Sequence, residues 1–184
     1  YINGRTPNPC VVCNETIKFG ALLEYALNKG YDFVATGHYA KIIYDNSLKR
    51  WLLKKAKTKK DQSYFLYKLN QHQLSHILFP VCDYEKSYVR EIAKKYDLPV
   101  ASNPESQDIC FIKNISHVDF IMKYKSYKPS LGKFIDQSDN ELGVHKGIIN
   151  YTVGQRKGLG IALGEPMYVN KIDAANNSVV LGDS

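Results

Sequence analysis

The sequence lacks several features that would place it outside ordinary globular proteins. It contains no run near the roughly 20 apolar residues that a membrane-spanning helix needs, and residues 1–9 hold no apolar stretch of the kind found in a signal peptide. Only 4 of its 184 residues are cysteine, so without a secretory signal a disulfide framework is not expected. With 44% hydrophobic and 23% charged residues, the composition also excludes a disordered tail, a collagen-like rod and a coiled coil. We expect a cytoplasmic chain of one domain or two small ones, with no membrane segment.

The positive charge is concentrated in one region. The net charge is +7, and residues 41–60 contain one acid, Asp45, together with a group of basic residues: Lys41, Lys49, Arg50, Lys54, Lys55, Lys57, Lys59 and Lys60. A basic cluster this local predicts a polyanionic partner, nucleic acid first. The alternative is a solvated hairpin that carries lysines on its edge.

The first two thirds of the sequence alternate between helical and extended patterns. Pro7 and Pro9 predict a loop over residues 4–13. Apolar periodicity then predicts a helix over 14–28, with Asn14 as its cap and Gly30 at its end. Further helices are expected at 60–69, 71–76, 84–96 and 116–124, strands at 32–36 and 107–112, and a hairpin of 39–44 with 51–55. This order predicts an α/β fold.

After about residue 126 the pattern becomes glycine-rich and extended. Short β-like runs occur at 133–135, 148–153, 167–172 and 179–181, and they predict a second, β-rich domain.

The cysteine pair Cys10-x-x-Cys13 has the spacing of a metal or cluster site, a redox pair or a sulfur-handling site, although such pairs also occur in ordinary loops. Cys13 precedes the helix expected from residue 14, whose amides would stabilise a thiolate, with help from Lys18 if that side chain points back. Adding Cys110 gives three thiolates and one open coordination position, as in reactive metal sites. Taken alone, Cys110 in an apolar strand is more typical of a core residue than of a nucleophile, and Cys82 has no partner at a meaningful spacing.

Two polar segments have the composition of phosphate-contacting loops. Lys60, Asp61 and Gln62 combine a cation, a carboxylate and an amide that can position a phosphate and a base edge, or else form a helix start. The segment GQRKGLG at 154–160 lets a backbone approach phosphates closely. It matches neither a Walker loop nor GxGxxG, so by itself it is a weak signal.

Five motifs in order, TPNPCVVCNETIKF, DFVATGHYAKI, KDQSYFLY, ESQDICFI and YTVGQRKGLGI, closely resemble the tRNA-specific 2-thiouridylases over nearly the whole chain. The resemblance implies an adenine-nucleotide α-hydrolase-like (PP-loop) catalytic domain, a small central domain and a C-terminal β-barrel. It places residues 1–114 in the later part of the catalytic domain, 115–163 in the central domain and 164–184 at the start of the barrel. It implies ATP-dependent replacement of the 2-oxygen of the wobble uridine of tRNA by sulfur, through adenylation of the uracil oxygen.

The resemblance also implies roles for single residues. Cys13 matches the nucleophile and Cys110 the cysteine that carries a persulfide. Asn8, Pro9 and Cys10 match the loop around the target base, Lys60, Asp61 and Gln62 a tRNA-contacting segment, and Gly37 an ATP-contacting glycine. The implied partners are tRNA and a sulfur-carrier or cysteine desulfurase protein, and the implied co-substrate is ATP with Mg.

Two mechanisms remain open at this point. In the first, the persulfide of Cys110 gives up its sulfur, and a Cys13–Cys110 disulfide forms that a reductant resets. In the second, Cys10, Cys13 and Cys110 hold a [4Fe–4S] cluster. Some members of the resembled family have Asp at the position of Cys10, so the residue at this position bears on the choice of mechanism. The family's SGGVDS pyrophosphate loop and the end of its barrel are absent from these residues. We therefore expect this segment alone to bind tRNA without adenylating it.

Overall fold

The computed structural model describes residues 1–102, 109–162 and 164–183, and the chain forms two compact units. The helical unit comprises Asn8–Gln107, and the sheet unit comprises Tyr1–Pro7 together with Asp108–Ser184. In the described part of the chain, no helix combines the length and the apolar character that crossing a membrane requires.

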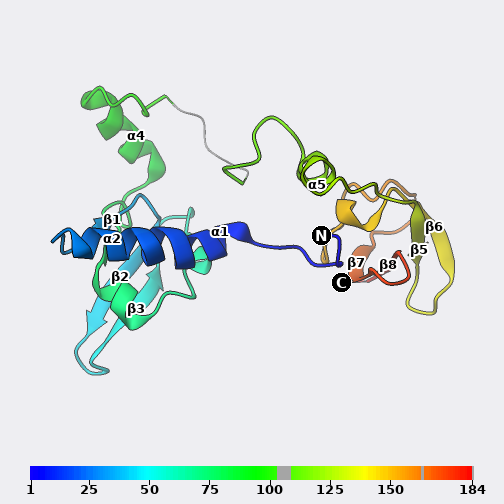
Figure 1. The fold of residues 1–184 in the computed structure, drawn as a ribbon, viewed down its shortest axis with the longest axis horizontal. Helices are drawn as coiled ribbons and strands as arrows, with labels where there is room; N and C mark the ends of the chain where they lie inside the picture. Colours follow the sequence, from blue (N-terminus) through cyan, green and yellow to red (C-terminus); the bar gives the residue numbers. More distant parts are fainter. Residues whose placement is uncertain (103–108, 163, 184) are drawn as a thin grey trace. The chain divides into compact units, whose positions relative to one another are not determined.

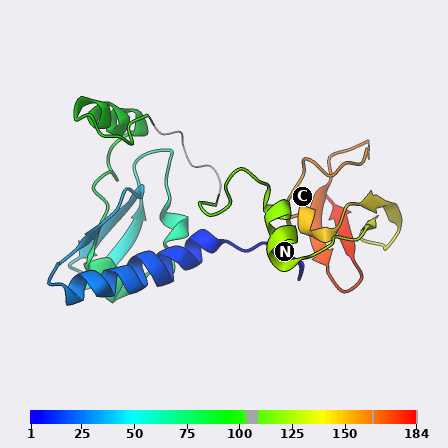
Figure 2. The same ribbon diagram turned by 45° about the horizontal axis from the view of Figure 1, so that its top comes forward.

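One long helix dominates the helical unit. It runs without a break through α1 (Pro9–Val12), η1 (Cys13–Ala21) and α2 (Leu22–Asn28), and it is the blue rod of Figures 1 and 2. Asn8 is its N-cap, because its side chain accepts a hydrogen bond from the amide of Val11, and Pro9 occupies the first turn, where a missing N–H costs nothing. The helix therefore begins five residues before the predicted start at residue 14. The prediction that Asn14 is the cap was wrong.

The middle of this helix is wound as a π-helix. The amide of Leu22 bonds to the carbonyl of Ile17, five residues back, which is the π spacing. Gly20 permits this winding, since a Cβ there would lie 2.9 Å from the carbonyl oxygen of Glu15. The buried amide of Gln73 binds two carbonyls of the same stretch, Glu15 at 3.2 Å and Phe19 at 2.8 Å. Long-range contacts thus stabilise a winding that the local sequence does not predict.

The rest of the helical unit is a small α/β assembly against one face of this helix. β1 (Val34–Ala35) pairs in parallel with β4 (Ile77–Leu78), and β2 (Ala40–Asp45) pairs with β3 (Arg50–Lys55) as the predicted hairpin. α3 (Gln71–Ser75) and α4 (Lys86–Lys95) confirm two predicted helices. Apolar side chains from the helix and these elements form one core: Phe19, Ala40, Leu66, Leu69, Leu74, Ile77 and Phe79.

The helix predicted over 60–69 is wrong, because only η2 (Ser63–Phe65), a single 3₁₀ turn, forms there. The side chain of Asp61 accepts bonds from the amide of Ala56 and the hydroxyl of Ser63, and Gln62 pairs with Tyr39. These polar side chains tie the segment to the base of the hairpin, and such bonds compete with a helix.

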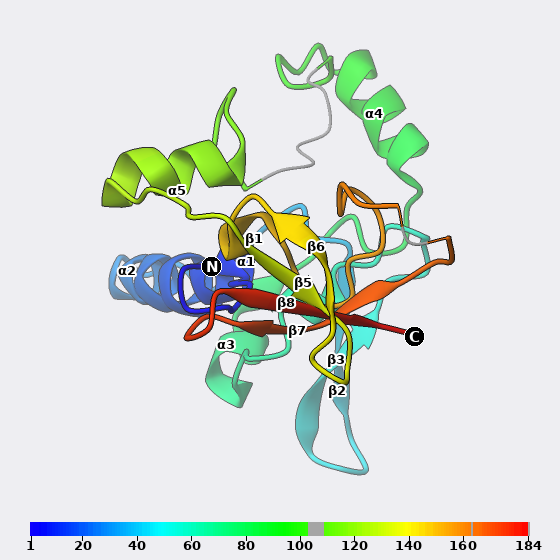
Figure 3. The same cartoon turned by 90° about the vertical axis from the view of Figure 1, so that its right-hand side faces the viewer.

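The sheet unit is built on four strands in the order β6-β5-β8-β7. They are β5 (Gly132–Ile135), β6 (Glu141–His145), β7 (Tyr168–Asp173) and β8 (Ser178–Gly182), drawn from yellow-green to red in Figure 3. β5 and β8 are parallel, and the other pairs are antiparallel. The division expected between residues 163 and 164 runs through this sheet, since β8 from the last stretch pairs with β5 from the preceding one.

Two local predictions in this unit have different outcomes. α5 (His117–Lys125) forms as expected, with Ser116 and Asp119 in a reciprocal capping box. The strand predicted at 148–153 is wrong, because η3 (Ile148–Asn150) forms a 3₁₀ turn instead. The side-chain amide of Asn150 bonds the carbonyls of Lys146 and Gly147, which closes the chain into a turn.

The first residues of the chain belong to the sheet unit, although they precede the helical unit in sequence. The ring of Tyr1 stacks on His117 at 4.7 Å between centroids. Gly4, at a φ of +69°, packs against Ile172 of β7, where a Cβ would lie 3.0 Å from a carbonyl oxygen. The hydroxyls of Thr6 and Thr152 are 3.0 Å apart. The segment that leads into the cysteine pair is thus anchored on the sheet unit.

Candidate functional site

The cysteine pair lies on the first turns of the long helix. Cys10 follows Pro9 within the opening turn, whereas Cys13 lies at the junction of α1 and η1, where its amide bonds to the carbonyls of Cys10 and Pro9. The prediction that Cys13 immediately precedes a helix was therefore wrong, and Cys10 is the cysteine at the amide-rich end. Both thiols are partly exposed, and all four cysteines of the chain are free.

Asn14 fixes this helix start against η2. Its side chain is buried, with 3% exposed, and its amide nitrogen donates to the carbonyl of Phe65 across 3.4 Å. The Oδ1 atom of Asn14 has no hydrogen-bond partner among the described residues. The neighbouring Tyr64 stays 57% exposed and rests on the ring of Phe65 at 3.8 Å between centroids. Burial, and then the charge of a Cys10 thiolate, raise the pKa of Tyr64.

Gly37 and His38 follow the carboxyl end of β1, where open parallel sheets bind ligands. Gly37 is exposed, and a Cβ there would meet nothing within 4 Å. His38 packs between Phe19 and Phe79, at 5.8 and 5.7 Å between ring centroids, and its Nδ1 is 2.8 Å from the hydroxyl of Thr36. Burial, with the nearby charge of Lys18, lowers the pKa of His38 to about 4, so the ring is neutral at neutral pH.

The segment of Lys60, Asp61 and Gln62 lies at the base of the hairpin. Burial raises the pKa of Asp61, but the hydrogen bonds from the Ala56 amide and from Ser63 outweigh it, so the pKa is lowered overall and the carboxylate stays ionised. Gln62 accepts a bond from the amide of Tyr39 at 3.1 Å. Two of the three side chains thus hold the segment in place.

The lysines of the basic cluster differ in their surroundings. The ammonium of Lys41 bonds both carboxylate oxygens of Asp83 at 3.0 Å, and that of Lys57 lies 3.6 Å from the same carboxylate. The hydrogen bond from Lys41 lowers the pKa of Asp83. Part of the positive charge expected to face a partner is therefore engaged by an acid that lies outside the basic segment.

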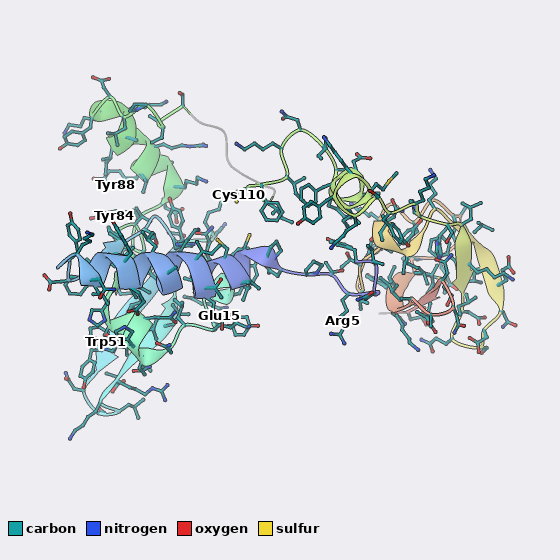
Figure 4. The ribbon with its side chains drawn as sticks, in the orientation of Figure 1. Arg5, Glu15, Trp51, Tyr84, Tyr88 and Cys110 are labelled. Carbon is teal, nitrogen blue, oxygen red and sulfur yellow. The ribbon has the colours of Figure 1, made fainter. Side chains whose placement is uncertain are left out.

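Cys110 lies in the sheet unit, just after residues 103–108. The strand predicted over 107–112 is not formed by the described residues 109–112, and residues 107 and 108 lie outside the described part. The amide of Ile112 bonds to the carbonyl of Ile109, which makes a turn, and Cys110 is exposed on it (Figure 4). The interpretation of Cys110 as a core residue was wrong. An exposed thiol on a turn is accessible for chemistry.

The structure thus places the predicted residues on two units. The helical unit brings together Asn8, Pro9, Cys10 and Cys13 at the start of one helix, and the sheet unit carries Cys110. Within residues 1–102, 109–162 and 164–183, no group of three or more His, Cys, Asp or Glu side chains is arranged to hold a metal ion. The sequence reasoning missed Asn14, Tyr64 and His38, whose only signals were their places beside the motifs.

Comparison with known proteins gives two family matches. Residues 1–114 match the model described as the tRNA methyl transferase HUP domain, and residues 118–183 match the tRNA methyl transferase PRC-barrel domain. The fold is accordingly a HUP (PP-loop) domain of mixed helices and strands followed by a PRC-barrel domain.

Curated relatives align over the whole chain. The chain is 55% identical over 184 residues to the tRNA-specific 2-thiouridylase MnmA of Acetivibrio thermocellus, and 52% identical over 185 residues to that of Clostridioides difficile. Each alignment covers 100% of this chain and 51% of the relative, so the chain spans about half the length of the curated relatives it matches. By the two family matches, the chain belongs to the family whose HUP and PRC-barrel domains the models describe, and over its whole length it is similar to curated tRNA-specific 2-thiouridylases.

Proposed function

We propose that the protein takes part in the ATP-dependent 2-thiolation of the wobble uridine of tRNA. The observation that carries this proposal is the Asn8–Pro9 cap, which holds Cys10 and Cys13 on the opening turns of one helix, in a chain 55% identical to a 2-thiouridylase. A thiol pair of this kind suits sulfur transfer, whereas transfer of a methyl group, which the family models' description names, needs no such pair.

The first step activates the base. ATP, with Mg, adenylates the uracil 2-oxygen and releases pyrophosphate. Gly37 supports a nucleotide contact, because its exposed backbone at the end of β1 leaves room for close approach. The neighbouring His38 is neutral at neutral pH and adds no charge there. The remainder of the nucleotide site, including the pyrophosphate loop, is not among these residues.

The second step transfers sulfur. A sulfur-carrier or cysteine desulfurase protein loads Cys110 with a persulfide. The terminal sulfur attacks C2 of the base and displaces AMP, which leaves the base joined to Cys110 through a disulfide. The Cys13 thiolate then attacks the sulfur atom of Cys110, the 2-thiouridine leaves, and a Cys13–Cys110 disulfide remains. A dithiol reductant supplies the two electrons that reset it. The exposure of Cys110 suits loading by a second protein.

The RNA contacts are proposed at two places in the helical unit. Asn8, Pro9 and Cys10 surround the target base at the helix start, where Tyr64 offers an exposed ring. Lys60, Asp61 and Gln62 contact the strand nearby, and the hairpin lysines contribute charge. The ties of Asp61 and Gln62 to the hairpin support this proposal, because a segment that is already ordered loses little entropy on binding.

An iron–sulfur alternative has a suitable donor set. Cys10, Cys13 and Cys110 supply three thiolates, the ligands that a [4Fe–4S] cluster prefers, and such a cluster would carry sulfur on its open iron. We propose the persulfide route, and the exposure of Cys110 supports it because a second protein can reach and load that thiol. For this segment taken alone, the corresponding proposal is a tRNA-binding module without catalysis.

The test is single-turnover thiolation of tRNA by the full-length protein with ATP and a persulfide donor. Cys13→Ser and Cys110→Ser should each abolish product, because each removes one sulfur of the transfer pair. Cys82→Ser is the matched control and should retain activity, since Cys82 packs against the core of the helical unit. Undiminished thiolation by Cys13→Ser would remove that residue from the mechanism.

A further inference from the structure

The basic glycine loop, defined here as residues 152–160, is held rigidly on the sheet unit. Its backbone pairs with the start of β7, since the amide of Gly154 donates to the carbonyl of Val169 at 2.7 Å, and the amide of Val169 donates to the carbonyl of Gln155 at 2.9 Å. The amide of Gln155 also donates to the carbonyl of Thr152 at 3.0 Å. These bonds fix the near end of the loop against a strand.

The side chain of Gln155 ties the two ends of the loop together. Its Oε1 accepts a bond from the amide of Thr152 at 3.0 Å, and its Nε2 donates to the carbonyl of Lys157, also at 3.0 Å. A single side chain thus satisfies backbone groups on both sides of Arg156. The loop is ordered before any ligand arrives, which lowers the entropic cost of binding.

The glycines of this loop are required by the backbone and leave its surface open. Gly154, Gly158 and Gly160 have φ values of +85°, +74° and +79°, which side-chain-bearing residues rarely adopt. A Cβ at Gly154 or Gly160 would meet nothing within 4 Å, so neither glycine is there to make room for packing. The exposed backbone is therefore accessible to an incoming group.

Two cations face solvent beside this open backbone. Arg156 and Lys157 are exposed, and within the described part of the chain neither forms an ion pair. They line a hollow of about 290 Å³ together with two glycines, one acid and four apolar residues: Gly158, Gly160, Glu165, Leu159, Ile161, Pro166 and Met167. A water molecule takes about 30 Å³ of liquid volume, so the hollow accommodates a phosphate group with its first waters. Two cations and one carboxylate leave a net charge of +1, which suits a singly charged phosphodiester better than a triphosphate.

The anchored N-terminal segment links this loop to the proposed base-binding residues. The hydroxyl of Thr152, where the loop begins, lies 3.0 Å from that of Thr6, and Asn8 is two residues further along the chain. At 3.3–3.6 Å per extended residue, Asn8 lies within about 7 Å of Thr6 and Arg156 within about 14 Å of Thr152. Arg5, on the same anchored segment, extends away from the ribbon in Figure 4. The Thr6–Thr152 hydrogen bond and the short chain lengths on either side of it therefore keep Arg156 within a few nucleotide lengths of Asn8.

We propose that the basic glycine loop binds the phosphodiester backbone of the RNA strand next to the target uridine, with Arg156 and Lys157 as its phosphate ligands. This inference rests on the proposed function for the identity of the RNA. It adds a binding site on the sheet unit to the base-binding residues of the helical unit.

The first test is the salt dependence of binding of the 184-residue chain to an anticodon stem-loop RNA. The slope of the logarithm of the association constant against the logarithm of the salt concentration is negative. The double variant R156Q/K157Q should make it shallower by about 1.4, since each single-stranded phosphate contact contributes about 0.7. Extrapolated from 1 M salt, this amounts to roughly a tenfold loss of affinity at 0.15 M. K123Q/K128Q removes the same charge from exposed positions of the sheet unit and should change the slope far less.

The second test locates the phosphate. Each phosphate within three nucleotides of the wobble position is replaced in turn by an uncharged methylphosphonate. At one or two positions the replacement should weaken binding to the wild-type chain severalfold and leave binding to R156Q/K157Q unchanged. Q155A, which keeps both cations but removes the tie, should weaken binding while leaving most of the salt slope.

Three results overturn the inference. The first is a slope change in R156Q/K157Q no larger than in the control K123Q/K128Q. The second is that every phosphate replacement weakens binding equally in the wild-type chain and in R156Q/K157Q. The third is a wild-type chain that fails to bind the RNA at low salt. The proposed function can fail while this inference stands. A full-length protein that binds RNA through this loop but does not thiolate tRNA would refute the proposed function and support the loop site. Conversely, a full-length R156Q/K157Q protein that still thiolates tRNA and keeps the wild-type salt slope would overturn the loop site and leave the proposed function standing.

Discussion

Gln73 and Gln71 offer a matched test of what holds the cysteine-bearing helix in its π winding. Both residues lie on α3, and each side chain makes two hydrogen bonds to distant backbone groups. Gln73 is 8% exposed and donates to the carbonyls of Glu15 and Phe19. Gln71 is exposed and bonds both the amide and the carbonyl of Trp51, at 2.8 and 3.0 Å. The two differ in burial and in one further bond, because the Oε1 of Gln73 also accepts from the amide of Asn70.

Truncation to alanine should separate the two. In Q73A, carbonyls of the π-helix lose their donor in a buried setting, at about 1–3 kcal/mol for an unsatisfied buried group. The capping-box bond to the amide of Asn70 is lost as well, at about 0.5–1 kcal/mol. We expect Q73A to lower the free energy of unfolding by about 1.5–4 kcal/mol. In Q71A water replaces both partners, so the expected loss is about 1 kcal/mol or less.

Urea denaturation of the chain, followed by circular dichroism, measures both losses. The variant Q73E keeps the shape of Gln73 but places an acceptor against two carbonyls, and it should be destabilised at least as much as Q73A. Equal losses in Q73A and Q71A would refute the reasoning, because they would show that burial of these bonds does not decide their contribution.

Three further predictions address other parts of the molecule. The pKa of His38 is about 4 in the folded chain against 6.5 in the unfolded chain, so the unfolded state takes up the proton first as pH falls. The contribution of the neutral ring to the free energy of unfolding is therefore complete above pH 6.5 and is lost towards pH 4. The full shift corresponds to about 3 kcal/mol, and because the ring is only partly buried we expect roughly 1.5 kcal/mol, absent in H38F, by urea midpoints across this pH range. G132A should lower the free energy of unfolding of the sheet unit by about 3 kcal/mol or more, since its Cβ would meet the carbonyl of Asn177 and the ring of His145, whereas G164A, with open space at its Cβ, should lose only about 1–2 kcal/mol; similar thermal shifts would contradict this. D83N should raise RNA affinity on the order of two- to fivefold at 0.1 M salt, because it releases Lys41 and Lys57, and the gain should vanish at 1 M salt; an unchanged affinity would show that these lysines do not face the RNA.

Local patterns predicted the elements that are set by neighbouring residues. The hairpin of β2 and β3, the helices α3, α4 and α5, and the strands β5, β7 and β8 all lie where periodicity and capping residues indicated. The Ser116 cap is a good example, because its partner Asp119 lies only three residues away. The family resemblance, carried by the five ordered motifs, is confirmed by matches over residues 1–114 and 118–183.

The wrong predictions of secondary structure include a segment whose contacts with distant residues override the preference of its local sequence. The segment after Lys60 does not form a helix because Asp61 and Gln62 bond to Ala56 and Tyr39, and no local pattern reveals such partners. The helix start was misplaced because Pro9 was interpreted as excluding a helix, although proline is favoured in a first turn. The roles of Cys13 and Cys110 stay predictions, since they depend on chemistry between groups carried by different units.

The central claim is that sulfur passes through Cys110 and Cys13 without an iron centre. The most direct measurement purifies the full-length protein without oxygen and determines iron and acid-labile sulfide per chain alongside single-turnover thiolation of tRNA. The account predicts full activity in protein free of iron, with Cys13→Ser and Cys110→Ser inactive. A near-stoichiometric cluster whose content tracks activity, and which is lost on replacing Cys10, would contradict it and assign all three cysteines as ligands.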